Sequence, residues 1–254
     1  MLIHDSFIVF FNLSKEINTY CHVLLSSIEI QRTRAKILLS SLFIKSLETY
    51  QSIHLLLQRG LIKEANILLR SLIEMCFYIK CISSDNGTDI KYILKGEFER
   101  IRKIKSLIEK CDSWHERQGG KESLQKEYNE SKDSFDRLLK DNNLKKKDIQ
   151  SFSPSSILGE ANQGCQDDRE MFQDLYVIYS LLCDDVHSNS ACLDDYFKRK
   201  NLNEIESINY GPKDNGMDRI LSTSMHCMIL ISDCVGQFFE VGNNEALNRY
   251  KDCL

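Results

Sequence analysis

Residues 55–82 read LLLQRGLIKEANILLRSLIEMCFYIKCI, and this stretch decides the fold class. From about Lys63 to Ile82 its apolar side chains recur with a period close to 3.6, as on a helix. The helix is apolar nearly all round, which is typical of a helix at the centre of a bundle. Gly60 stands just before it, where a glycine is the expected C-cap of a preceding helix. The stretch therefore predicts two consecutive helices, the second of them central.

The same period extends over most of the chain, and strand-like alternation is not visible. Only Pro154 and Pro212 interrupt it, so long helices are permitted. The further helical segments that we expect are a block from about Phe7 to Gln58, a core helix from about Asp168 to Val186, a short helix reaching about Lys198, and last helices from about Met217 to Val241 and from Asn244 onward. The sequence predicts an all-α bundle of six to nine helices, with residues 1–254 forming a single helical domain.

A charged segment interrupts this pattern between Lys95 and Asp148, where 15 basic and 12 acidic residues are interleaved. Gly119 and Gly120 divide it into two helices. We expect a long charged hairpin and loop, inserted as residues 89–150, with residues 142–156 as a linker or ordered loop. The interleaving favours a solvated arm with many i,i+4 ion pairs. A nucleic-acid surface formed by Lys145, Lys146 and Lys147 with Lys140 and Arg137 is the sharper alternative, although the net excess is only three charges.

Composition excludes several classes of protein. With 42% hydrophobic residues and a net charge of −4, the 254-residue chain is not predominantly disordered. No segment approaches the roughly 18 consecutive apolar residues of a membrane span, and the opening residues lack a basic leader, so we expect a cytoplasmic protein without membrane contact. The ten cysteines form no CxxC pair and mostly fall in apolar helical patterns. We therefore expect reduced thiols packed as small hydrophobes, with no structural zinc and no cofactor.

Arg70 and Glu74 are the first candidate site residues, because they lie i,i+4 on the otherwise apolar central helix. Charged side chains in such surroundings need partners. A buried ion pair that fixes helix register is one interpretation. The order Arg then Glu is, however, the less favourable orientation for a pair within one helix, which indicates that at least one of the two meets a third partner.

His187 is the second candidate. Phe172, Tyr176, Tyr179, Cys183 and His187 fall on one helical stripe, at offsets of four, seven, eleven and fifteen residues. A histidine in the last turn of a helix often binds terminal carbonyls. Beside Asp184 and Asp185 it could instead be a general acid or base whose tautomer a carboxylate sets. The two tyrosine hydroxyls favour a polar pocket over a plain core.

Two other constellations stay open. The segment from Asp167 to Asp195 holds eight acidic residues and one basic residue, so it could form a metal site for hydrolysis. The candidate ligands are Asp184, Asp185, His187, Asp194 and Asp195, whose spacing fits no metal motif. Arg219 and His226 form an R-x6-H pair on one helix face, in a segment that otherwise reads as core.

The chain resembles an uncharacterised all-helical bacterial family in three successive stretches: LLLQRGLIKEANILLRSLIE, the charged region that follows it, and YVIYSLLCDDVHSNS. Its pattern is a helix with Gly, Ala and R-x3-E, and later Y-x2-Y before a helix-ending His. That family is similar to the HEPN helical bundles, which include metal-independent toxin and anti-phage ribonucleases, are often dimeric and use an R-x4-6-H motif. Here the residues five to seven positions before His187 are Leu182, Leu181 and Ser180. The resemblance therefore implies that Arg70 supplies the guanidinium from another helix.

Our leading hypothesis is a HEPN-like endoribonuclease effector of a bacterial anti-phage defence or toxin system. His187 would transfer protons, Arg70 would stabilise phosphorane charge, Glu74 would orient them, and Tyr176 and Tyr179 would position RNA. The alternative is a non-catalytic module, in which the charged hairpin docks a partner protein. We also expect a homodimer, because Phe7, Ile8, Phe10 and Phe11 form an apolar patch near the N-terminus.

Overall fold

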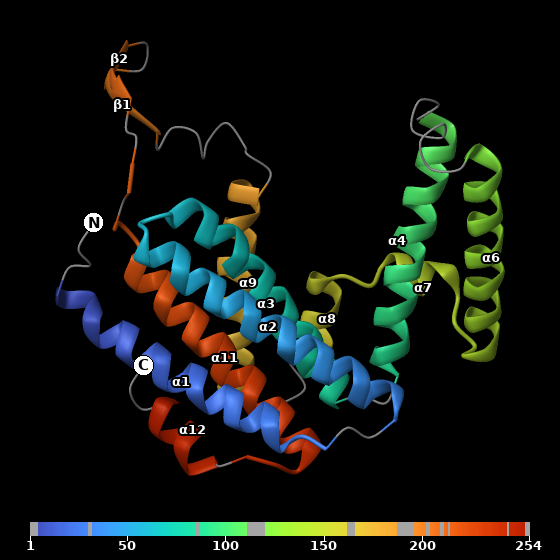
Figure 1. The fold of residues 1–254 in the computed structure, drawn as a ribbon, viewed down its shortest axis with the longest axis horizontal. Helices are drawn as coiled ribbons and strands as arrows, with labels where there is room; N and C mark the ends of the chain where they lie inside the picture. The colour runs from blue at the N-terminus through green and yellow to red at the C-terminus, as the bar shows by residue number, and fades with distance from the viewer. Residues whose placement is uncertain are drawn as a thin grey trace. The chain divides into compact units, whose positions relative to one another are not determined.

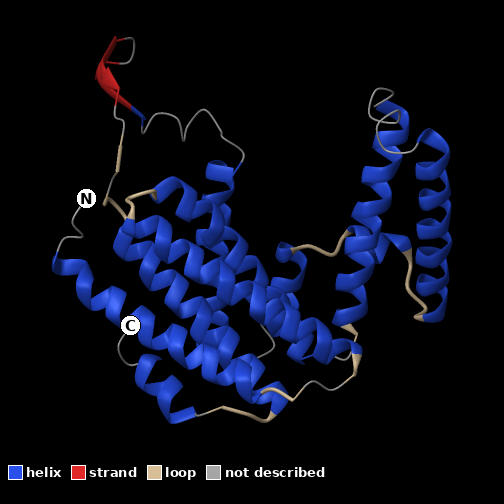
Figure 2. Ribbon diagram, in the orientation of Figure 1, coloured by secondary structure: helices blue, strands red, loops and turns tan. Residues whose placement is uncertain are grey.

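The computed structural model describes residues 5–29, 32–84, 87–110, 120–161, 166–186, 196–201, 204–208, 211–212, 214–242 and 244–251. Over these residues the chain forms ten helices and one two-stranded sheet (Figures 1 and 2). The elements are α1 (Asp5–Ser27), α2 (Arg34–Gln58), α3 (Ile62–Ser84), α4 (Thr88–Lys110), α6 (Gly120–Asp141), α7 (Lys146–Gln150), α8 (Pro154–Ala161), α9 (Gln166–Val186), β1 (Phe197–Asn201), β2 (Glu204–Ile208), α11 (Met217–Phe239) and α12 (Asn244–Lys251). The all-α fold class is confirmed.

The chain divides into two compact units, one made of residues 1–84 and 158–254 and the other of residues 85–157. The first unit contains α1, α2, α3, α9 and α11. The second contains α4, α6 and α7, and the hairpin expected at residues 89–150 falls within it. None of the described helices combines the length and the apolar character that crossing a bilayer requires.

Helices α3 and α11 form the core of the first unit. Helix α11 packs against α1, α2 and α3, and α3 also packs against α2 and α9. At the end of α11 the chain turns back against the helix, and the N–H of Val241 donates to the carbonyl of Gly236 at 2.9 Å. A Cβ at Gly236 would lie 2.8 Å from the carbonyl oxygen of Val241, so only glycine fits this position. The central position predicted for the helix over 63–82 therefore agrees with the packing of α3.

The turn between α2 and α3 confirms the predicted role of Gly60. This glycine has a φ of 69°, in the left-handed region that favours glycine. Its N–H donates to the carbonyl of Leu57 at 2.9 Å, and the N–H of Leu61 donates to that of Leu56 at 3.0 Å. These two bonds form a Schellman motif, which satisfies the last carbonyls of α2 and lets α3 begin two residues later.

The block expected from Phe7 to Gln58 is two helices, α1 and α2, although neither glycine nor proline separates them. The hydroxyl of Ser26 donates to the carbonyl of His22 at 2.8 Å, and that of Ser27 donates to Leu24 at 2.7 Å. The Leu24 carbonyl is one of the last four of α1, which have no partner within the helix, so the Ser27 hydroxyl satisfies one of these carbonyls where the helix ends. The expected apolar patch is also smaller, because Phe11 is buried while Ile8 remains 45% exposed.

The second unit is a charged helical hairpin with a small core of its own. Ile90, Leu94 and Phe98 of α4 pack against residues of α6 and against Ile149 of α7. On the outside, α4 and α6 carry ion pairs within each helix, such as Lys95–Glu99 and Lys126–Glu130. Arg100 of α4 also reaches Glu127 of α6 at 2.8 Å. These charged side chains remain exposed to solvent and pair with residues of the same unit, the arrangement that the interleaved sequence favours.

Two local expectations are corrected. The stretch 142–156, read as a linker or loop, contains α7 and the start of α8. Pro154 occupies the first turn of α8, where its missing N–H is tolerated, and the N–H of Ser156 donates to the Ser153 hydroxyl at 3.3 Å. Most of the short helix expected to reach about Lys198 lies outside the described residues, but its last residues belong to strand β1, which pairs antiparallel with β2 and places Phe197 opposite Ile208. The sequence does not reveal this strand, because it is a run of Lys and Arg in which only Phe197 is partly buried.

The cysteines follow the expectation of small buried hydrophobes at most described positions. Cys76, Cys81, Cys227 and Cys234 are buried free thiols, Cys183 is half-buried, and Cys192 lies outside the described residues. Burial raises the pKa of Cys21 and of Cys234 to about 12. Thiols of this kind remain protonated at neutral pH and are poor nucleophiles.

Candidate functional site

The candidate site lies where α3 packs against α9. The two helices are antiparallel here, because Phe77 of α3 contacts Phe172 near the start of α9 whereas Arg70, two turns earlier, contacts Tyr179. Leucine and isoleucine side chains anchor α3 in the core on its other sides. The antiparallel packing therefore brings Arg70 to the carboxyl-terminal half of α9, the half that carries the predicted tyrosine stripe.

Arg70 makes three hydrogen bonds, two of which join α3 to α9. Its Nη2 donates to the hydroxyl of Tyr179 at 2.8 Å, and its Nε donates to Sγ of Cys183 at 3.3 Å. Its Nη1 lies 3.4 Å from Oε2 of Glu74, one turn along α3. The guanidinium carbon also lies 4.5 Å from the centre of the Tyr179 ring, within cation–π range. Tyr179 and Cys183 are therefore the further partners that the unfavourable Arg–Glu order indicated.

Tyr176 extends this group, which we call the Arg70 cluster: Arg70, Glu74, Tyr176, Tyr179 and Cys183. The rings of Tyr176 and Tyr179 are stacked, with centres 6.1 Å apart and planes 21° apart. Burial raises the pKa of Tyr179, and Glu74 adds to the rise while Arg70 opposes it. The Tyr179 hydroxyl consequently keeps its proton at neutral pH.

The charge in the cluster is only partly shielded from solvent. The side chains of Arg70 and Glu74 retain 19% and 31% exposure. Burial alone would lower the pKa of Arg70, but the Cys183 hydrogen bond and the nearby Tyr179 and Glu74 outweigh it, and the pKa is raised. Arginine has five N–H donors, and three of those on Arg70 have partners among the described residues. The other two N–H groups have no partner among the described residues, and free N–H groups on a fixed, charged guanidinium are suited to an anionic ligand such as a phosphate.

Of the five predicted site residues, the structure brings four together and leaves one undescribed. Arg70, Glu74, Tyr176 and Tyr179 belong to the cluster. His187 lies outside the described residues, as do the side chains of Asp184, Asp185, Asp194 and Asp195. The acidic metal site therefore stays untested. In the part of the chain that the structure describes, no three His, Cys, Asp or Glu residues are grouped so as to hold a metal ion.

The R-x6-H pair reads as structural. His226 of α11 is partly buried, and its Nδ1–H donates to the carbonyl of Ser222 in the same helix at 3.0 Å. Arg219 is exposed. Cys183 is a further member of the cluster, which the sequence places on the tyrosine stripe but does not single out as a site residue. Its position i+4 from Tyr179, on the stripe that carries the tyrosines, was the available signal.

The fold and the cluster define an all-helical protein with a polar, partly open site between two core helices. The chain belongs to the family of unknown function DUF5677, which matches residues 36–205. The predicted membership of an uncharacterised helical family is thus confirmed. The matched range includes every member of the Arg70 cluster and also His187. Neither the curated proteins nor the solved structures contain a significant match to the chain.

Proposed function

We propose that this protein is a metal-independent endoribonuclease, resembling the HEPN ribonucleases, that acts in a bacterial anti-phage defence or toxin system in the cytoplasm. The observation that supports it is the fixed guanidinium of Arg70, with two N–H groups available, on the helix pair whose second member precedes His187 by one residue. A guanidinium of this kind is suited to binding a phosphodiester and stabilising the charge that develops during its cleavage.

In the proposed reaction, His187 takes the proton of a ribose 2′-hydroxyl, whose oxygen attacks the neighbouring phosphorus. Arg70 donates hydrogen bonds to the phosphorane oxygens, Glu74 and Tyr179 hold the guanidinium, and Tyr176 presents a ring on which a base stacks. The bond from phosphorus to the 5′-oxygen breaks, and that oxygen takes a proton. The products are a 2′,3′-cyclic phosphate and a 5′-hydroxyl, and the mechanism requires no metal or organic cofactor.

A homodimer would supply the second proton-transfer group. One His187 acts as the base, and His187 of a second copy protonates the leaving 5′-oxygen, so that each step has its own imidazole. The exposed Ile8 and Val9 of α1 are candidate contacts in such a dimer. Light scattering should then give about twice the 29.5 kDa mass of the chain at micromolar concentration.

The proposal is tested with purified protein and a fluorescent single-stranded RNA. We expect cleavage that persists in EDTA and leaves cyclic-phosphate ends. His187→Ala should lower the rate roughly 10²–10⁴-fold, and Arg70→Ala roughly 10²–10³-fold. The matched control is Arg219→Ala, an exposed arginine of α11, which should keep full activity. Thermal melting of each variant separates loss of activity from loss of folding. Full activity of the His187→Ala protein would contradict the mechanism.

The second candidate function is a non-catalytic interaction module. The observation in its favour is that residues 85–157 form a separate unit with its own core, as a docking arm requires. In that case no RNA is cleaved by the wild-type protein, and a bacterial partner protein binds the charged arm. Removal of the charges of Lys145, Lys146 and Lys147 should then weaken partner binding, whereas the Arg70→Ala variant should bind normally.

A further inference from the structure

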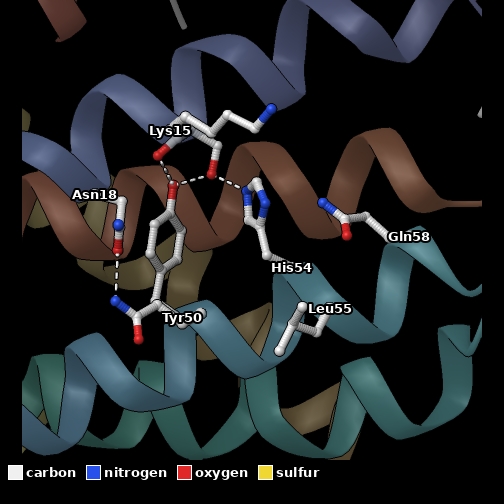
Figure 3. Close-up of a pocket in the computed structure, with 8 residues that line it drawn as sticks. Lys15, Asn18, Tyr50, His54, Leu55 and Gln58 are labelled. Atoms are coloured by element: carbon white, nitrogen blue, oxygen red, sulfur yellow. Dashed lines mark hydrogen bonds between the residues drawn. The ribbon is translucent and has the colours of Figure 1, made fainter.

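A second polar site lies between α1 and α2, on helices that do not contribute to the Arg70 cluster. It is a pocket of about 240 Å³, and seven of its eight lining residues are polar. In Figure 3 Tyr50 and His54 of α2 point toward α1, from which Lys15 and Asn18 extend. The volume corresponds to about eight water molecules, which is smaller than the usual site for a drug-sized ligand. The pocket therefore suits a small metabolite.

The base of the pocket is a fixed hydrogen-bond network. The Ser14 hydroxyl contacts both the hydroxyl of Tyr50 and Nε2 of His54, and the Tyr50 hydroxyl also donates to the Ser14 carbonyl at 3.3 Å. Ser14 and Tyr50 are buried. The ring of Phe11 meets the His54 ring edge-on, with 5.1 Å between centres. These contacts hold the imidazole in one orientation at the pocket wall, so a ligand would meet a preorganised surface.

Among the described residues that line the pocket, Lys15 alone has a charged side chain. Burial, with a smaller contribution from Lys15, lowers the pKa of His54 to about 4, so the imidazole is uncharged at neutral pH. The lining residues include no carboxylate. The described lining of the pocket thus carries a single positive charge, which favours an anion.

Two of the hydrogen-bonding groups at the pocket are available. Within the described part of the chain, neither the Lys15 ammonium nor the Gln58 side-chain amide has a hydrogen-bond or ion-pair partner. In Figure 3 Lys15 passes above the His54 ring, and the Gln58 amide lies beside the ring. Leu55, also at the pocket, is 64% exposed and offers an apolar surface. A ligand with an anionic head and an aliphatic tail would satisfy both kinds of surface.

We propose that this pocket binds a small aliphatic monocarboxylate, with its carboxylate between Lys15 and Gln58 and its tail against Leu55. One ammonium group balances one negative charge. A phosphate dianion would leave an uncompensated charge in a partly desolvated site, which is unfavourable. The site is independent of the proposed ribonuclease activity, and its test involves no RNA.

The probe is hexanoate, which has a carboxylate and a short tail, and hexanamide is its uncharged counterpart of equal size. Calorimetry at pH 7 should give a Kd for hexanoate in the range of ~0.1–1 mM, and binding of hexanamide at least ~10-fold weaker. Binding should also move the NMR signals of the His54 ring. Failure to bind at 10 mM, equal binding of hexanamide, or unchanged His54 signals would each overturn the proposal.

Two variants locate the charge and the donor. Lys15→Gln, at an exposed position, should weaken hexanoate binding at least ~10-fold, and Gln58→Leu should weaken it by a smaller factor. The matched control is Lys45→Gln, an exposed lysine of α2 that does not line the pocket and should bind as the wild type does. Unchanged binding by the Lys15→Gln protein would contradict the site. Displacement of hexanoate by an equal concentration of inorganic phosphate would contradict the preference for a monocarboxylate.

Discussion

The Arg70 cluster and the Ser14–Tyr50–His54 network handle buried polar groups in opposite ways. The Arg70 cluster joins helices whose contact residues are 109 positions apart, carries formal charges and keeps part of its surface in solvent. The network joins neighbouring helices, is uncharged at neutral pH and encloses Ser14 and Tyr50 completely. The difference follows from the cost of desolvating charge, which a hydroxyl or a neutral imidazole largely avoids. Lowering the pH should therefore destabilise the network by protonating His54, whereas added salt should weaken the ion pair of the Arg70 cluster.

The largest effect on stability should come from acidification of the network. The pKa of His54 is about 4 in the folded chain against 6.5 ordinarily. Between these values the unfolded chain binds a proton that the folded chain does not, so the free energy of unfolding falls as the pH decreases below about 6.5. From pH 7 to pH 5 this linkage amounts to about 2 kcal/mol. The groups that face the imidazole are Lys15 of α1 and Tyr50 of α2, and Tyr50 stays protonated throughout because burial raises its pKa.

The contribution of His54 to the pH dependence of stability is measured by urea unfolding of the wild type and of the His54→Gln variant at pH 7 and at pH 5. The stability difference between the two proteins should change by about 2 kcal/mol between pH 7 and pH 5. Parallel pH dependences would show that His54 is not held in its neutral form.

The next effect should come from Ser14→Ala. The change leaves Nε2 of His54 without its partner and leaves the Tyr50 hydroxyl with only its long bond to the backbone, so we expect a loss of about 1–2 kcal/mol. Ser41→Ala is the matched control, because this exposed hydroxyl bonds only within α2. Equal melting temperatures for the two variants would argue against a stabilising network.

Arg70→Ala should lower the free energy of unfolding by about 1 kcal/mol, because it removes three hydrogen bonds made by a side chain that solvent still reaches. Arg70→Lys should recover only part of this, because an ammonium group cannot reproduce the planar fork. Chemical denaturation measures both, with Arg219→Ala as the reference. A fully stable Arg70→Lys protein would show that charge alone, and not the geometry of the guanidinium, matters here.

The smallest effect should come from Glu74→Gln, which weakens a 3.4 Å ion pair that is open to solvent. We expect a loss of about 0.3–0.5 kcal/mol at low salt and no measurable loss in 1 M NaCl. If the loss persists in high salt, Glu74 acts through hydrogen bonding and not through its charge.

The two sites also differ in how far sequence could predict them. Arg70 and Glu74 stand out as charges on an apolar helix, and the periodicity of α9 placed Tyr176 and Tyr179 on one stripe. The sequence did not predict the Ser14–Tyr50–His54 network, because Ser, Tyr and His are as compatible with a buried helix stripe as with a pocket. Their pattern becomes informative only once the position of α1 against α2 is known. The helices were predictable from their period, whereas the hairpin of β1 and β2 was not, because nearly all its residues are exposed and show no alternation.

The insertion of residues 85–157 has a consequence for synthesis on the ribosome. Helix α3 is buried on most of its faces, yet two of its packing partners, α9 and α11, follow the insertion in the chain. At roughly 5–20 residues per second, the ribosome needs several seconds to translate the intervening unit. Of the three helices that pack against α3 in the described structure, α2 is the one already translated during that interval. We therefore expect apolar faces of α3 to be exposed at this stage, while the inserted unit has a core of its own with which to fold.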